Sequence, residues 1–141
     1  MKDIMLKIVG VHVHDNTEEE NMELMTEGQL FERNGVLYVT YEESEFTGIP
    51  GCKTRLRLEG DSVKMTRIGK DVGVSTEMNF TKGKRHEGTY DTPYGPVAME
   101  ILTNDLRNYM TSEGTGGVMI DYTISLKGLT EGRSKLSIEI V

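Results

Sequence analysis

Arg67 has the residue type and the spacing to bind an anion inside the fold. It follows Val63 and Met65 at intervals of two, and residues two apart on a β-strand point to the same side of a sheet. A buried guanidinium must be paired or hydrogen-bonded, and it binds a carboxylate or phosphate through two parallel hydrogen bonds. The spacing therefore predicts an interior site for a small anionic or amphipathic ligand, with Arg67 as its anchor. The alternative is an ion pair near the rim that closes one end of the fold.

Three further side chains have the chemistry to complete this site. Tyr41 and Glu43 share their side of a strand with Leu37 and Val39, so both are expected to point inward. Glu43 is then a partner for the guanidinium, and Tyr90 on a later strand supplies a hydroxyl. The same groups could act as general acids or bases on a small acid. Because no nucleophile–base pair or Cys–His motif accompanies them, ligand binding is favoured over an enzyme, and no cofactor is expected.

Tyr94 lies in a dense turn, 91–96, in which Pro93 fixes one backbone angle and Gly95 relaxes another. Loops at the mouth of a scaffold often carry recognition residues, so Tyr94 is a candidate ligand contact. The alternative is that Pro93 and Gly95 serve only to form the turn, without any role in binding.

His12 and His14 are two residues apart, a spacing at which both side chains share a face and could hold a metal ion. Val9, Val11 and Val13 are expected to occupy the core side of the same strand. That assignment leaves both histidines in water, so no metal site is expected.

Composition limits the partners. The chain of 141 residues suits one domain spanning 1–141, and its net charge of −7 argues against binding to nucleic acid or anionic lipid. Cys52 is the only cysteine, which is typical of a reducing compartment. No stretch resembles a signal peptide or reaches the roughly 18 consecutive apolar residues of a membrane helix. We therefore expect a cytoplasmic protein that binds neither nucleic acid nor membrane.

The side chains that build the scaffold favour β-structure. Val, Ile and Thr are abundant, and Ala98 is the only alanine. Alternating apolar and polar runs predict strands at 3–14, 22–33, 36–46, 53–60, 62–69, 74–81, 85–92, 95–103, 117–127 and 134–141. The short turns between them require antiparallel neighbours, and a sheet of this size tends to close on itself. The prediction is an all-β fold, a single up-and-down antiparallel barrel of about 8–10 strands, with a flattened sandwich as the alternative.

Two local segments refine this prediction. Asn34 and Gly35 both tolerate a positive φ, so they predict a type I′ hairpin turn. The stretch 104–110 is ambiguous, because Asn104 could cap a helical turn or continue the preceding strand.

Scattered residues through the chain resemble the YwiB-like family, a domain of unknown function found in Firmicutes. The matching residues are Tyr38, Tyr41, Glu42, Glu43, Gly48, Thr66, Arg67, Ile68, Gly69, Tyr90, Thr92, Pro93, Tyr94, Gly95 and Thr103. The resemblance implies a lipocalin-like, calycin-type β-barrel that stands alone in the cytoplasm, and it implies no established activity. The chain has no Trp, so the Gly-x-Trp signature of true lipocalins is missing and secreted lipid transport does not carry over.

A filled barrel that acts through its surface is the alternative function. The chain contains nine Met, which adapt well both to cores and to interfaces. Met5, Met22, Met25 and Met119 fall on faces that the pattern does not assign. If two or more of them cluster on the exterior, a homodimer is expected within this alternative of a protein-interaction module.

Overall fold

The computed structural model describes residues 1–14, 19–42, 53–68, 75–92, 95–126 and 130–141. The described part of the chain contains ten β-strands and no α-helix. The strands are β1 (Lys2–His14), β2 (Glu19–Arg33), β3 (Val36–Glu42), β4 (Lys53–Glu59), β5 (Ser62–Ile68), β6 (Ser75–Thr81), β7 (Arg85–Thr92), β8 (Gly95–Asn108), β9 (Gly117–Leu126) and β10 (Thr130–Ile140). Within these ranges, no helix is long and apolar enough to cross a bilayer.

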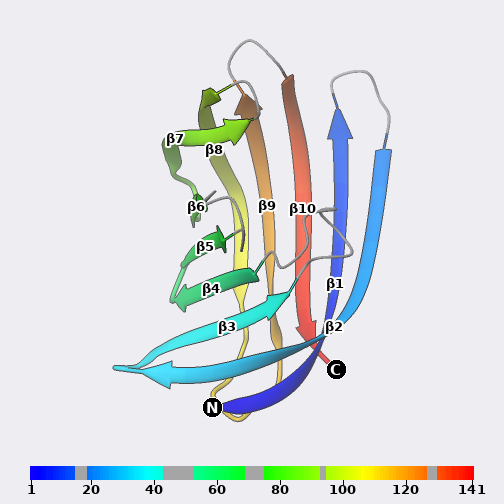
Figure 1. Cartoon of the computed structure of the whole chain (residues 1–141), viewed down its shortest axis with the longest axis vertical. Coiled ribbons are helices and arrows are strands. Elements are labelled where there is room, and N and C mark those ends of the chain that lie inside the picture. Colours follow the sequence, from blue (N-terminus) through cyan, green and yellow to red (C-terminus); the bar gives the residue numbers. More distant parts are fainter. Residues whose placement is uncertain (15–18, 43–52, 69–74, 93–94, 127–129) are drawn as a thin grey trace.

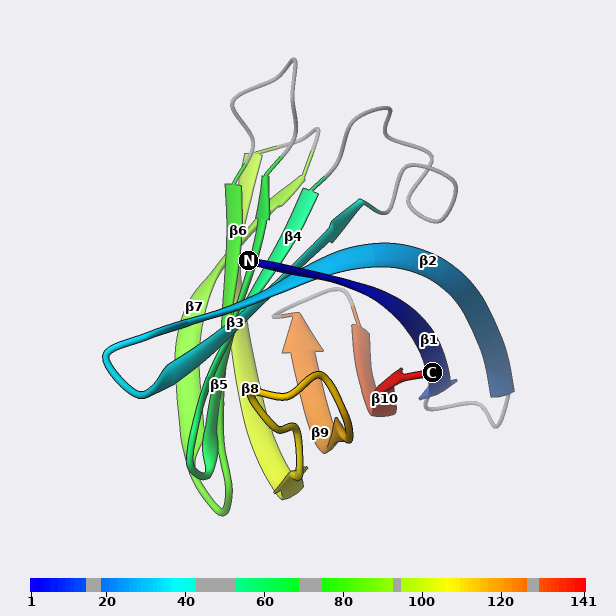
Figure 2. The ribbon, with the colours of Figure 1, turned by 90° about the horizontal axis from the view of Figure 1, so that it is seen from below.

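All ten strands belong to one sheet, in the order β6-β5-β4-β3-β2-β1-β10-β9-β8-β7. Every neighbouring pair is antiparallel, and β10 lies between β1 and β9 (Figure 1). In the β1–β10 ladder, Leu6 lies opposite Ile140. The shorter strands β3 to β6 run across the direction of the long strands β1, β9 and β10 (Figures 1 and 2). The sheet therefore curls into a nearly closed antiparallel barrel, which confirms the predicted fold class.

The barrel closes where the two end strands, β6 and β7, meet. The turn between them is tied to β8 by backbone hydrogen bonds from Gly83 N to Thr103 O (2.9 Å) and from Thr103 N to Lys84 O (3.1 Å). Beyond this turn, the described residues of β6 and β7 form no ladder with each other. The seam is thus closed at one end of the barrel.

Alternation of side chains separates the core from the outer surface. On β9, Val118 and Ile120 are buried, whereas the intervening Met119 is 45% exposed. Met110 packs into the same core. Both termini lie at one end of the long strands β1 and β10 (Figure 1). The opposite end, where β1, β3, β5, β7 and β9 finish, is named here the Arg67 end, because Arg67 is the penultimate residue of β5.

The predicted hairpin turn between β2 and β3 is confirmed. Asn34 has a φ of 54° and Gly35 a φ of 78°. Two successive positive φ values are those of a type I′ turn, whose twist matches that of the flanking strands.

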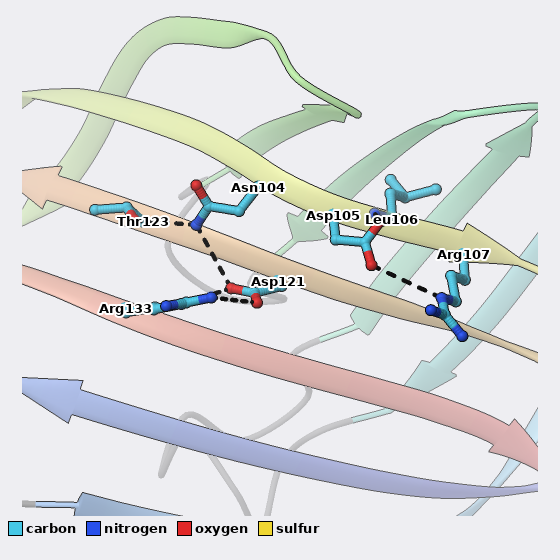
Figure 3. Close-up of polar contacts among 7 residues, drawn as sticks. All are labelled: Asn104, Asp105, Leu106, Arg107, Asp121, Thr123 and Arg133. Carbon is cyan, nitrogen blue, oxygen red and sulfur yellow. Dashed lines mark hydrogen bonds and ion pairs between the residues drawn. The ribbon is translucent and has the colours of Figure 1, made fainter.

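The ambiguous stretch 104–110 continues β8 as far as Asn108 and does not form a helix. A β-bulge lies between Thr103 and Asp105, where the register with β9 shifts by one residue. The bulge keeps the inner face apolar, since Leu106 is buried in the place that Asp105 would otherwise take. Asn104 points outward and donates hydrogen bonds to Asp121 (3.5 Å) and Thr123 (3.2 Å) on β9 (Figure 3).

Beside the bulge, Arg133 donates two hydrogen bonds to the carboxylate of Asp121, from Nε (2.9 Å) and Nη2 (2.7 Å) (Figure 3). The hydrogen bonds from Arg133 lower the pKa of Asp121 below its ordinary value of 3.8. A group with a lowered folded-state pKa contributes its full stability above the unfolded pKa and loses it as the pH falls through the folded pKa. We therefore expect Asp121→Asn to lower the midpoint temperature of unfolding at neutral pH and to reduce its further decline below about pH 4.

Thermal unfolding followed by circular dichroism across the acid range would measure this effect. Asp61→Asn, in the turn between β4 and β5, is the matched control and should keep the acid profile of the unchanged protein. An identical acid profile in all three proteins would contradict the role given to Asp121.

The structure corrects the faces assigned to β1. Leu6 and Ile8 are buried, so the even-numbered residues of β1 point inward. Val9, Val11 and Val13 therefore face outward, and the expectation that they occupy the core is wrong. His12, expected in water, lies on the inner face and is half-buried.

Candidate functional site

A row of polar side chains crosses the inner face near the Arg67 end of the barrel. Tyr41 on β3 pairs with Thr54 on β4, which in turn pairs with Arg67 on β5. Tyr41 is 3% exposed and Thr54 is fully buried. Three adjacent strands thus present a phenol, a hydroxyl and a guanidinium to the interior.

Arg67 lies where its strand pattern predicts. Val63 and Met65 are buried on β5, and Arg67 continues the same side of the strand. The residue is partly buried, and its Nε atom is buried. The inward orientation predicted for Arg67 and for Tyr41 is therefore confirmed.

The facing wall contributes a second polar row, on β1, β10 and β9. His12 pairs with Ser134, and Ser134 pairs with Tyr122. The His12 ring nitrogen Nδ1 hydrogen-bonds to the Ser134 hydroxyl, and Ser134 also hydrogen-bonds to the phenol of Tyr122. Ser134 is 7% exposed, so this chain of contacts lies inside the barrel.

Tyr122 connects the two walls. Burial raises the pKa of its phenol, and the Ser134 hydrogen bond and the positive charge of Arg67 lower it by less. The net direction is upward, so the phenol keeps its proton at neutral pH and can donate a hydrogen bond. Arg67 and Tyr122 come from opposite walls but lie within electrostatic reach of each other.

The Tyr122 ring also limits the depth of the site. Its centroid lies 4.8 Å from that of Phe80 on β6, with the rings inclined by 58°. Phe80 is 1% exposed. The two rings therefore fill the middle of the barrel, between the polar rows and the apolar core.

Thr103 adds a buried polar atom at the same level. It lies opposite Tyr122 in the β8–β9 register and is fully buried. Its hydroxyl oxygen hydrogen-bonds to none of the residues that the structure describes. Buried hydroxyl groups normally have a partner, so this position can accept a water molecule or a polar ligand atom.

Apolar inner side chains remain partly exposed toward the Arg67 end. They include Leu24 on β2 together with Ile124 and Leu126 on β9. A hollow of about 1000 Å³ lies over β1 to β3; its lining includes the inward-facing Leu24, Gly28 and Tyr41 together with outward-facing residues such as Met5 and Glu27, and does not include Arg67. The interior at the Arg67 end is thus amphipathic, with the charged Arg67 on one side and partly exposed apolar side chains of β2 and β9 on the other.

The remaining predicted site residues fall at the limit of the described structure. Glu43 and Tyr94 lie outside the described residues. Tyr90 lies opposite Val97 in the β7–β8 register, and only its backbone is described. The structure therefore brings Arg67 and Tyr41 to one face and does not place the side chains of the other three.

The sequence interpretation missed the row on the facing wall. Ser134 continues, two residues at a time, the buried series that includes Ile138, so extending that series backwards would have found it. His12 was missed because the wrong face of β1 was taken as buried. Among the described residues, no group of three metal-ligating side chains could hold a metal ion.

Comparison with known proteins supports the fold. A solved structure described as the crystal structure of the YwiB protein from Bacillus subtilis is similar, with a TM-score of 0.79 and 20% sequence identity over 99% of this chain and 92% of that chain. At this identity the likeness shows the fold alone. No curated protein matches the chain. Residues 6–138 match a family described as a domain of unknown function (DUF1934). With that match over most of its length, the chain belongs to the YwiB-like DUF1934 family, as its scattered motifs predicted.

Proposed function

We propose that the protein binds a small anionic ligand inside the barrel, with Arg67 as the anchor. The observation that carries the proposal is the position of Arg67, which faces the interior beside Thr54 and across from the protonated phenol of Tyr122. A guanidinium and a phenol together suit the oxygens of a carboxylate or phosphate.

The apolar side chains inside the Arg67 end favour a ligand with an apolar body. Leu24, Ile124 and Leu126 are partly exposed inward-facing side chains, and covering them on binding would add hydrophobic free energy. The acid group would then lie at Arg67 and the apolar part against β2 and β9. This arrangement corresponds to a calycin-like carrier or sensor of a small amphipathic acid, which we place in the cytoplasm.

Tyr41 belongs to the same proposal as a neighbour of the anchor. Glu43, Tyr90 and Tyr94 remain proposed contacts on the strength of their sequence positions. Glu43 would balance the charge of Arg67 when no ligand is bound, and the two tyrosines would contact the ligand from the Arg67 end.

Native mass spectrometry of gently purified protein, compared with its denatured mass, would reveal a ligand that remains bound. Binding of octanoate and octyl phosphate, measured by calorimetry with octanol as the neutral analogue, tests the predicted chemistry directly. We expect both acids to bind and octanol to bind at least about tenfold more weakly, because it lacks the charge that pairs with the guanidinium.

Arg67→Met is expected to weaken binding of either acid by about 100-fold, since it removes a charge-assisted pair and keeps an apolar side chain of similar length. Arg55→Met is the matched control, because Arg55 lies on the exposed outer face of β4 and should not affect binding. Unchanged affinity in Arg67→Met, or equal loss in both variants, would overturn the proposed site.

A further inference from the structure

The outer face of β1 carries an unusual run of apolar side chains. Val9, Val11 and Val13 point outward in succession, and Val13 is 39% exposed. The wet face of an antiparallel sheet normally alternates polar residues with the core. Met119 on β9 (45% exposed) lies beyond Ser137 from Val9, and Met25 on β2 (53% exposed) lies opposite Lys7, so each adds apolar surface near the valines. We call the outer surface of β9, β10, β1 and β2 around Val9 and Val11 the valine wall.

The two borders of the valine wall carry opposite charges. On the β2 side, Glu23 lies opposite Val9; its side chain is 63% exposed and forms an ion pair with Lys7 on β1 (3.6 Å). On the β10 side, Lys135 lies opposite Val11 and is exposed. The apolar strand is therefore flanked by an acidic strand and by a strand with a basic residue at almost the same level.

We propose that the valine wall is the interface of a two-fold symmetric dimer of this chain, with its axis parallel to β1. Rotation about such an axis places the β2 side of one copy over the β10 side of the other. Glu23 of each copy, ion-paired with Lys7 of its own chain, then also lies within reach of Lys135 of the second copy, and the valines of the two β1 strands pack against each other. An interface of this kind is self-complementary, as a two-fold axis requires.

The charge pattern also distinguishes this arrangement from pairing at a strand edge. The first part of β2, up to Glu27, forms a ladder with β1, and no other described strand pairs with its second edge. That stretch contains four glutamates, and an antiparallel pairing of two copies would bring these like charges together. The face therefore favours self-association, whereas the edge opposes it.

Sedimentation velocity on the full chain tests the proposal. The unchanged protein is expected to sediment as a dimer at about 100 µM. Val11→Asp should raise the dimer dissociation constant at least about 100-fold, because it buries unpaired charge in the interface. Ile68→Asp is the matched control, since Ile68 is 47% exposed on β5 and lies outside the valine wall. A monomeric unchanged protein, or equal weakening by both variants, would overturn the proposal.

A charge exchange tests the two-fold geometry even if Val11→Asp does not fold. Lys135→Glu and Glu23→Lys should each weaken the dimer about tenfold, and the double variant should regain the original dissociation constant within about threefold. Lys84→Glu, in the turn between β6 and β7, makes the same charge change away from the valine wall and should have no effect. If the double variant loses as much dimerisation free energy as the two single variants combined, these residues do not meet across the interface.

Discussion

Replacing Phe80 with alanine is expected to lower the free energy of unfolding by about 3–5 kcal/mol. Phe80 is 1% exposed, and its ring packs against Tyr122 at 4.8 Å, so truncation leaves a cavity in the middle of the barrel. The surrounding strands are held by ladders on both sides and can collapse into that cavity only in part. Urea unfolding followed by circular dichroism would measure the loss.

Phe31→Ala is the matched control for this variant. Phe31 stacks on Tyr38 at 4.9 Å with an angle of 5° between the rings, but it lies on the partly exposed outer face. Its loss should cost about 1 kcal/mol, because little apolar surface returns to water. Equal losses in the two variants would show that the interior at Phe80 is less tightly packed than the structure indicates.

The Phe80 variant also bears on the ligand site. The Tyr122 phenol interacts with both Ser134 and Arg67, and the Phe80 ring packs against the Tyr122 ring and holds it in position. Phe80→Leu, which keeps most of the apolar volume, should fold with a smaller loss of stability and still weaken octanoate binding. Full binding in Phe80→Leu would mean that the Tyr122 ring does not need this support.

Replacing Gly116 with alanine is expected to have an effect of similar size, more than about 3 kcal/mol. Gly116 has a φ of +88°, and a Cβ atom there would collide with the backbone oxygen of Tyr109. The collision cannot be relieved locally, because Tyr109 N donates to Gly117 O (2.8 Å) and Ile140 N donates to Gly116 O (2.9 Å). The turn between β8 and β9 and the end of β10 would have to move together.

Gly35→Ala separates the collision from the backbone conformation. Gly35 has a φ of +78°, but no heavy atom lies within 4 Å of a Cβ placed there. Its substitution should cost only about 1–2 kcal/mol, the strain of a left-handed alanine. Chemical unfolding of both variants would measure the difference, and equal costs would show that the contact with Tyr109 is unimportant.

Local patterns were sufficient to predict the scaffold. Asn34 and Gly35 specify their own turn, and the alternation from Val118 to Leu126 identifies β9 together with its buried face. These features depend only on neighbours in the chain, so one sequence is enough to find them.

Prediction failed where the deciding contact was distant in sequence. On β1, both alternating sets are largely apolar, and only the ladder with β10 determines that Leu6 and Ile8 are buried while Val9 is not. Asn104 has the residue type of a helix cap, but its side chain bonds to β9 across a bulge that the sequence does not reveal.

The candidate site shows the same division. The alternation of side chains along β5 and β3 is enough to predict that Arg67 and Tyr41 point inward. The contact between Tyr122 and Arg67 follows from barrel closure, which brings β9 opposite β5. Individual orientations could be predicted, whereas the grouping of side chains from opposite walls could not.

The ladder between β1 and β10 has a consequence for how the chain reaches this structure. Leu6 pairs with Ile140, so the first of the ten strands can complete its ladder only after the last of them has been synthesised. Closing so long a loop carries an entropic cost, and folds dominated by distant pairings form slowly. Until β10 arrives, the apolar inner face of β1 and one of its edges stay open to other chains. The newly made protein is then most exposed to aggregation and to proteases, and removal of β10 would prolong that state indefinitely.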